Sequence, residues 1–223
     1  MTKAEFAAIE NYMLAQMKDS AHDMHHVYRV LNSALDIANY EAVDDINVLI
    51  AAALLHDIGR EQQFANPKLC HATVGSETAY EFLISLGWPA QQASHVKNCI
   101  HTHRYRSDNL PQSIEAKILF DADKLDVSGA IGIARTLFYQ GQVSAPLYII
   151  NSDGDIVTDG GGGGVSSFFQ EYNYKLKKIH GSFFTARAKE LALKRQDAAQ
   201  SFYNSLYDEI NTNYENGIKK FLL

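Results

Sequence analysis

Apolar residues recur at the spacing of α-helices over most of the chain. Over residues 24–40 they follow the i, i+3, i+4, i+7 pattern of an amphipathic helix. Its apolar positions are Val27, Val30, Leu31, Ala34, Leu35 and Ala38. Residues 45–55 are apolar on nearly every side, which is typical of a helix in the centre of a bundle. We expect Gly59 to end this helix in the left-handed conformation.

The helical period continues beyond this point and then stops. It predicts further helices at residues 71–86, 89–100, 111–126 and 130–139. Gly87 is expected to end the first of them, and prolines are expected to open the next two. Residues 141–165 include five consecutive glycines and predict a loop or a short hairpin.

The fold class predicted from this pattern is all-α. We expect a single domain over residues 1–223, with a helical core, a glycine-rich insertion and additional C-terminal helices. Their approximate bounds are 20–140 for the core, 141–165 for the insertion and 166–215 for the last helices.

Charge and composition narrow the function classes. The chain has 20 Lys and Arg against 26 Asp and Glu, a net charge of −6, so it lacks the basic surface that nucleic-acid polymers or anionic membranes require. A small phosphate substrate stays compatible, because a metal ion and one or two basic side chains can reverse the charge locally. No run is apolar enough to span a bilayer, and two cysteines cannot build a disulfide framework, so we expect a cytoplasmic protein. The oligomeric state is left open, a homo-oligomer included.

Residues that can bind metal lie near the ends of successive predicted helices. His56 and Asp57 close the apolar helix, where a buried carboxylate is costly unless it is paired or bound to a metal. A hydrogen-bonded helix end explains the same pair without a metal. Asp123 and Lys124 stand in an acidic stretch on the helix predicted at 111–126, where a solvated charged face is the alternative.

The order His26, His56-Asp57, Asp123 resembles the His…His-Asp…Asp signature of the HD-domain metal-dependent phosphohydrolase superfamily. Further resemblance lies in Leu-Leu-His-Asp-Ile-Gly-Arg at 54–60, His-Ala-Thr-Val-Gly at 71–75 and Asp-Ala-Asp-Lys-Leu-Asp at 121–126. These motifs are similar to those of a compact, stand-alone bacterial branch that includes nucleotide pyrophosphatases. The resemblance implies an HD-domain helical bundle.

The resemblance also implies roles for individual residues. The metal ligands would be His26, His56, Asp57 and Asp123. Such a mixed nitrogen and oxygen set suits Mn²⁺, Fe²⁺, Co²⁺, Ni²⁺, Zn²⁺ or Mg²⁺ and would orient a water toward phosphorus.

Other side chains would contact the substrate. Lys124 and Arg60 would bind phosphate, and Glu61 would orient the attacking water. His71 would contact phosphate or protonate the leaving oxygen, unless it binds a second metal. His103 or His101 would serve a second metal or the substrate, and the sequence does not separate the two.

The expected function is therefore metal-dependent hydrolysis of a small phosphorylated molecule, with a nucleotide as the first choice. Pyrophosphate release from a (deoxy)nucleoside triphosphate is the leading reaction, on the resemblance alone. A nucleoside monophosphate phosphatase and a non-catalytic, metal-dependent nucleotide-sensing module are the alternatives.

Overall fold

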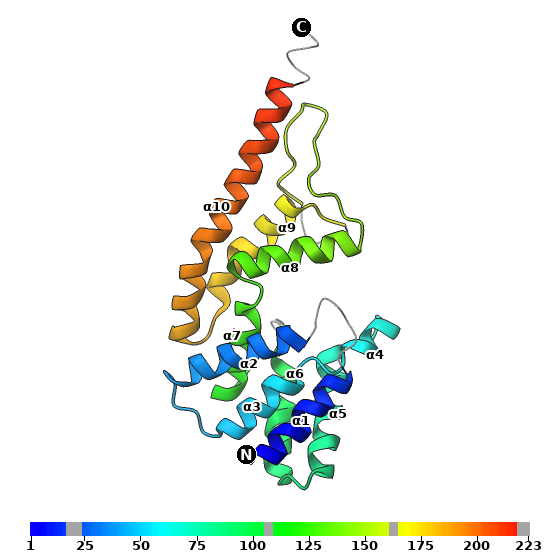
Figure 1. Cartoon of the computed structure of the whole chain (residues 1–223), viewed down its shortest axis with the longest axis vertical. Helices are drawn as coiled ribbons and strands as arrows, with labels where there is room; N and C mark the ends of the chain where they lie inside the picture. Colours follow the sequence, from blue (N-terminus) through cyan, green and yellow to red (C-terminus); the bar gives the residue numbers. More distant parts are fainter. Residues whose placement is uncertain (17–23, 105–108, 161–164, 218–223) are drawn as a thin grey trace. The chain divides into compact units, whose positions relative to one another are not determined.

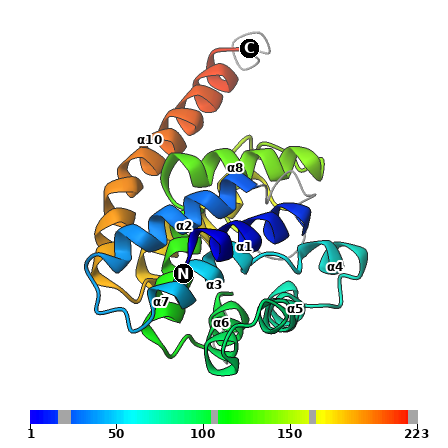
Figure 2. The same ribbon diagram turned by 60° about the horizontal axis from the view of Figure 1, so that its bottom comes forward.

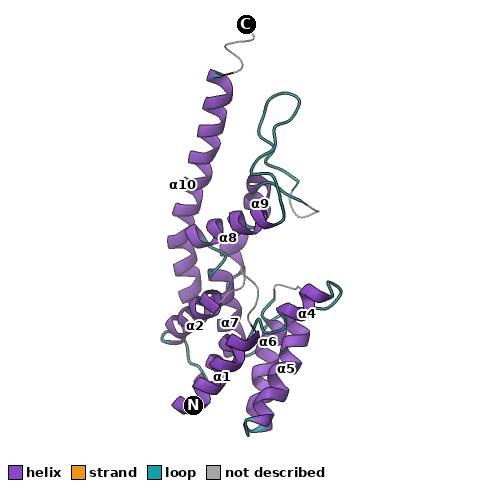
Figure 3. Ribbon diagram, turned by 45° about the vertical axis from the view of Figure 1, so that its right-hand side comes forward, coloured by secondary structure: helices purple, strands orange, loops and turns teal. Residues whose placement is uncertain are grey.

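The computed structural model describes residues 1–16, 24–104, 109–160 and 165–217, and within these ranges the regular structure is helical (Figure 1). The helices are α1 (Lys3–Gln16), α2 (Met24–Ala38), α3 (Ile46–Leu55), α4 (Arg60–Ala65), α5 (His71–Ser85), α6 (Ala90–Thr102), α7 (Ile114–Leu125), α8 (Gly129–Gln142), α9 (Phe168–Tyr174), the 3₁₀ helix η1 (Leu176–Ser182) and α10 (Ala186–Asn216). The all-α prediction is confirmed. In the described part of the predicted hairpin, Ile150 and Ile156 form an isolated antiparallel bridge, and Figure 3 shows this segment as loop.

The chain divides into two compact units. Unit 1 comprises Met1–Asp126 and Phe183–Ala188, and unit 2 comprises Val127–Ser182 and Lys189–Leu223. The expectation of one domain over residues 1–223 stays a prediction. None of the helices in the described ranges has the length and apolar character that crossing a bilayer requires.

Helix α3 forms the centre of unit 1. Its side chains from Ala51 to Leu55 are completely buried, because α1, α2, α6 and α7 all pack against it (Figure 2). The helix begins at a polar cap, where a carboxylate oxygen of Asp45 accepts hydrogen bonds from the backbone N–H groups of Asn47 and Val48. The nearly uninterrupted apolar run therefore lies where its pattern predicted.

The expectation that Gly59 ends α3 in the left-handed conformation is wrong. The φ of Gly59 is −85°, so it is not in the left-handed conformation. A β-carbon built at Gly59 would instead lie 2.3 Å from the carbonyl oxygen of His71 and 2.7 Å from the backbone nitrogen of Gly75. The residue is glycine because the backbone of α5 approaches it closely. Gly87, with φ +82°, does end α5 in the expected way.

Asp121 fastens the segment Phe183–Ala188 to the rest of unit 1. The carboxylate is fully buried and accepts hydrogen bonds from the backbone N–H of Phe184 and from both the N–H and the hydroxyl of Thr185, at 2.7 to 3.1 Å. The hydroxyl of Thr185 in turn accepts from the N–H of Ala188, so the start of α10 is capped.

We expect Asp121→Asn to lower the free energy of unfolding by about 2 kcal/mol, because the new amide N–H₂ would face the donors that the carboxylate now accepts. For a protein of this size, the melting temperature should fall by about 4–8 °C in thermal unfolding followed by circular dichroism. Asp197→Asn, at an exposed position of α10, is the matched control and should leave the melting temperature unchanged. An Asp121→Asn protein that melts with the wild type would contradict this account of the carboxylate.

Unit 2 has a core of its own, built largely from aromatic rings. Phe168 and Phe169, at the start of α9, are fully buried, and Tyr172 lies one turn further on. The ring of Tyr172 lies 4.5 Å from that of Tyr203 on α10, centroid to centroid. Helix α10 thus packs its aromatic side chains against α9.

Candidate metal centre

Six histidine and aspartate side chains from five helix ends or helix faces meet inside unit 1. They are His26 on α2, His56 and Asp57 at the end of α3, His71 at the start of α5, His103 at the end of α6 and Asp123 on α7. The histidines and Asp57 are at most 1% exposed, and the side chain of Asp123 is 14% exposed. Residues separated by as many as 97 positions are therefore brought into one buried cluster.

The first half of this cluster consists of His26, His56 and Asp123. The Nε2 atoms of His26 and His56 lie 3.3 Å apart, and Nε2 of His26 lies 3.5 Å from Oδ1 of Asp123. One potential ligand atom from each of the three residues lies within 4.8 Å of the others. That separation lets a single cation contact all three.

The second half consists of Asp57, His71 and His103. The Nε2 atoms of His71 and His103 also lie 3.3 Å apart, and they lie 3.5 Å and 3.6 Å from Oδ1 of Asp57. The other oxygen of Asp57, Oδ2, faces the first half, at 3.5 Å from Nε2 of His26 and 3.6 Å from Nε2 of His56. Asp57 thus turns one carboxylate oxygen toward each half.

Hydrogen bonds on the outer ring nitrogens orient the histidines. Nδ1 of His56 lies 2.8 Å from the carbonyl oxygen of Ala53, and Nδ1 of His103 lies 2.6 Å from that of Ile100. A carbonyl oxygen only accepts, so each Nδ1 donates, and in the neutral ring Nε2 is left with its lone pair. Nδ1 of His26 donates in the same way to Asp126, at 2.7 Å.

In the centre of the cluster, hydrogen-bond acceptors therefore face one another: the Nε2 atoms of neutral histidines and the oxygens of the carboxylates. When the rings are neutral, lone pairs on Nε2 atoms only 3.3 Å apart repel each other, and Oδ2 of Asp57 accepts no hydrogen bond from the described residues although it is buried. A cation between them turns each repulsion into a ligand bond, and outer hydrogen bonds to metal-binding histidines are the usual supporting arrangement. The donor set fits divalent metal ions, as the sequence predicted.

Burial would lower the pKa of His26, but Asp126 and Asp57 beside it raise that pKa. Electrostatics keep four other groups of the cluster in the forms that bind metal. Burial lowers the pKa of His56 to about 4, and burial together with the nearby Arg60 lowers that of His71 to about 2. Burial alone would raise the pKa of Asp57, but the Arg60 guanidinium and the surrounding histidines hold it well below its usual range. Burial of Asp123 is outweighed in the same way by Lys124. At neutral pH both imidazoles are neutral and both carboxyl groups are ionised.

Two basic side chains lie at the edge of the cluster. Nε of Arg60 donates to Oδ1 of Asp57 at 2.9 Å, and Nζ of Lys124 donates to Oδ2 of Asp123 at 2.8 Å. Both side chains are partly exposed, at 28% and 17%. They neutralise the carboxylates on one side and remain accessible to an anion on the other.

The structure also separates the residues that the sequence left unresolved. His103 is 1% exposed and belongs to the cluster, whereas the side chain of His101 is exposed on α6. Glu61 is exposed in the first turn of α4. Their roles in the reaction stay predictions.

Two further residues support the histidines of the cluster, and one of them, Gln63, was missed in the sequence. The side-chain oxygen of Gln63 accepts from Nδ1 of His71, and Asp126 receives two hydrogen bonds from Arg29 besides that of His26. A glutamine in a polar turn gives no signal by itself. Asp126 had one, because it lies three residues after Asp123 and so on the same side of α7.

The two cysteines are expected to differ sharply in reactivity. Burial would raise the pKa of the Cys70 thiol, but N–H groups at the start of α5 and the Arg104 guanidinium, 3.5 Å from the sulfur, lower it to about 6. Burial raises the pKa of Cys99 to about 12. At pH 7.5 iodoacetamide should therefore alkylate Cys70 rapidly and Cys99 hardly at all.

The alkylation rate of Cys70 should fall as the pH is lowered through about 6, because the thiolate then takes up a proton. Peptide mass spectrometry after timed quenching measures both sites. Cys70→Ser should abolish the rapid phase, and equal labelling of the two cysteines would contradict the assignment.

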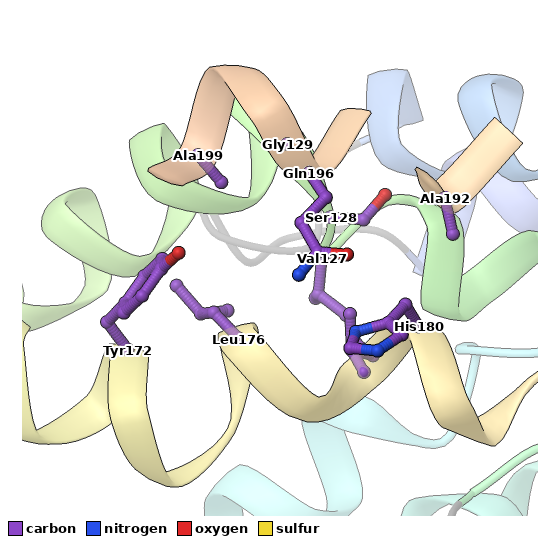
Figure 4. A pocket seen from close by; sticks show the side chains of 10 residues that line it. Val127, Ser128, Gly129, Tyr172, Leu176, His180, Ala192, Gln196 and Ala199 are labelled. Atoms are coloured by element: carbon purple, nitrogen blue, oxygen red, sulfur yellow. The ribbon is translucent and has the colours of Figure 1, made fainter. Parts of the chain in front are cut away.

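Two hollows in unit 2 contain none of the six clustered residues. The cavity in Figure 4 has a volume of about 10 Å³, enough for roughly one water, and Ser128, Gln196 and His180 are among the side chains around it. The other is an open hollow of about 650 Å³, lined by Asp159, Asn173, Lys177, Lys178 and His180.

Comparisons with known proteins agree with this fold. The family model of the HD domain matches residues 24–128. The Bacillus subtilis protein YpgQ is 29% identical over an alignment of 197 positions that covers 86% of each chain. Its crystal structure in complex with ADP has a TM-score of 0.72 at 26% identity and covers 92% of this chain and 97% of that one.

Two similar structures carry the family's name. An HD-superfamily hydrolase from Bacillus thuringiensis has a TM-score of 0.71 at 26% identity, over 94% of this chain and 98% of that one. A predicted HD superfamily hydrolase from an uncultured Thermotogales bacterium has a TM-score of 0.62 at 28% identity, over 93% and 92%. Residues 24–128 therefore match the HD domain, and these matches, together with the signature residues His26, His56-Asp57 and Asp123, support the HD-domain superfamily of metal-dependent phosphohydrolases.

Proposed function

We propose that this protein hydrolyses a phosphate bond of a nucleotide, with release of pyrophosphate from a (deoxy)nucleoside triphosphate as the leading reaction. The observation that carries the proposal is the position of Asp57, which turns one oxygen toward each half of the cluster while Arg60 and Lys124 stand at its edge. Divalent ions bound there would supply a water of lowered pKa and offset the charge of the phosphate oxygens.

The chain's own residues would divide the remaining work. His26, His56, Asp57 and Asp123 would hold the first ion, and His71 and His103, sharing Asp57, would hold a second. In this arrangement His71 is a ligand, because its Nε2 points at Asp57 and His103.

Phosphate binding would fall to the accessible cations. Lys124 and Arg60 can each donate to a phosphate oxygen while remaining next to their carboxylates, which fixes the phosphate relative to the metal centre. Glu61, exposed one residue after Arg60, would orient the attacking water.

A nucleotide is favoured over other phosphate compounds by one comparison. The similar protein YpgQ has been crystallised in complex with ADP. The chain's net charge of −6 does not oppose a nucleotide, because metal ions, Arg60 and Lys124 make the site locally positive.

The test uses the purified full-length protein loaded with Mn²⁺ and a panel of ribo- and deoxyribonucleotides, with orthophosphate and pyrophosphate measured separately. Pyrophosphate from triphosphates supports the leading reaction, whereas orthophosphate from monophosphates supports the phosphatase alternative. If neither ion is released with any divalent metal, the proposal is wrong. Metal-dependent thermal stabilisation by nucleotide without turnover would then indicate a sensing module.

A further inference from the structure

Phe64 is the most exposed large hydrophobic side chain in the part of the chain that the structure describes. It is 89% exposed, and the next in order, Val165, is 67% exposed. Single exposed apolar residues are common on protein surfaces and need no explanation. Phe64 differs from these because it lies on α4, the short helix that directly follows the His56-Asp57 pair.

Helix α4 is attached to the metal centre through the face that carries Phe64. Arg60 and Phe64 are four residues apart and Gln63 adjoins that row, so the three side chains occupy neighbouring positions on one side of the helix. Arg60 donates to Asp57, and Gln63 accepts from His71. The side of α4 that hydrogen-bonds to Asp57 and His71 therefore also carries the exposed ring of Phe64.

The spacing matches the parts of a nucleotide. Four residues of α-helix, about 6 Å along the axis, separate Arg60 from Phe64. In a nucleotide a single sugar separates the charged phosphate from the flat apolar base. A phosphate near Arg60 would thus bring the base within reach of the ring.

We propose that Phe64 is the platform on which the base of the bound nucleotide stacks. The inference rests on the nucleotide part of the proposed function and assigns a residue to recognition of the base. An aromatic ring stacks on every base, so the contact would add affinity with little choice among bases. It would also explain why a phenylalanine is kept in contact with water beside a polar site.

The experiment compares two probes on the metal-loaded full-length protein by isothermal titration calorimetry. ADP has both phosphates and a base, whereas inorganic pyrophosphate has only the phosphates. Phe64→Ala should raise the Kd for ADP by about 5- to 100-fold and leave the Kd for pyrophosphate unchanged. Phe64→Trp should keep wild-type affinity for ADP, because stacking needs an aromatic ring and not phenylalanine itself.

Phe138→Ala is the matched control, since Phe138 is 53% exposed on α8 in unit 2. It should leave both dissociation constants unchanged. The inference is overturned if Phe64→Ala binds ADP as the wild type does, if pyrophosphate affinity falls to the same extent, or if the substitution changes only the oligomeric state in size-exclusion chromatography with light scattering. The last result would assign Phe64 to a contact between protein chains.

The inference and the proposed function can fail separately. Turnover of nucleotides with a KM unaffected by Phe64→Ala would leave the hydrolase proposal standing and remove the platform. Phe64-dependent binding of ADP without turnover of any nucleotide would support the platform and contradict the hydrolase proposal.

Discussion

Asp57→Asn is expected to remove the bound divalent metal and the phosphohydrolase activity together. Asp57 is completely buried, and its two oxygens face the two halves of the cluster at 3.5 to 3.6 Å from four histidine nitrogens. An amide of the same shape offers one weaker, neutral oxygen and turns an N–H₂ group toward a cation. Because each of the two proposed ions would lose a ligand, kcat/KM should fall by at least about 1,000-fold.

The measurement pairs elemental analysis of the purified protein with its rate on the best nucleotide. Asp153→Asn removes the same charge at an exposed position of unit 2 and should retain both metal and activity. Circular dichroism of each variant confirms that the helices are intact. An Asp57→Asn protein with the wild-type metal content would show that this carboxylate is not a ligand.

The fold and the buried position of the His56-Asp57 pair could be predicted because their signals are strong. Helix α3 lies where an apolar run predicted it, and its last residues place His56 and Asp57 inside the bundle. A buried carboxylate beside an imidazole needs a counter-charge or hydrogen-bond donors, and the resemblance implied that a metal ion is this partner. His26 and Asp123 needed the resemblance, since nothing in their spacing shows that α2 and α7 face each other.

Residues at helix ends were the harder part. Which of His101 and His103 is buried depends on where α6 ends and how it packs, and a shift of two residues turns a side chain to the opposite side. Helix α4 has six residues, too few for a hydrophobic period to appear, so neither the role of Gln63 nor the exposure of Phe64 was visible. The start of α7 at Ile114 instead of Pro111 reflects the cap at Ser113, whose hydroxyl accepts from Ala116.

Gly59 shows how a motif residue without functional groups can control the metal centre. The helix following His56-Asp57 and the start of α5 approach so closely that a β-carbon at Gly59 would overlap the carbonyl oxygen of His71 and the nitrogen of Gly75. These are backbone atoms, so the clash is relieved only if the Gly59 segment and α5 move apart. Such a movement would separate His71, at the start of α5, from Asp57, two residues before Gly59.

Gly59→Ala is therefore expected to lower the free energy of unfolding by about 3 kcal/mol or more, and the melting temperature by about 6–12 °C. It should also weaken binding of a second metal ion more than that of the first, because His71 belongs to only one half of the cluster. Thermal unfolding of the apo protein and titration with Mn²⁺ measure the two effects independently.

Substitutions at two other glycines, Gly75 and Gly141, serve as comparisons for Gly59→Ala. A β-carbon at Gly75 would meet Gly59 at 3.0 to 3.4 Å, so Gly75→Ala should show the same effects in weaker form. At Gly141, in α8, a β-carbon meets nothing within 4 Å, and alanine should raise the free energy of unfolding by up to about 1 kcal/mol through its higher helix propensity. If Gly59→Ala were as stable as Gly141→Ala and bound metal normally, the close approach of the two backbones could not be what positions His71 against Asp57.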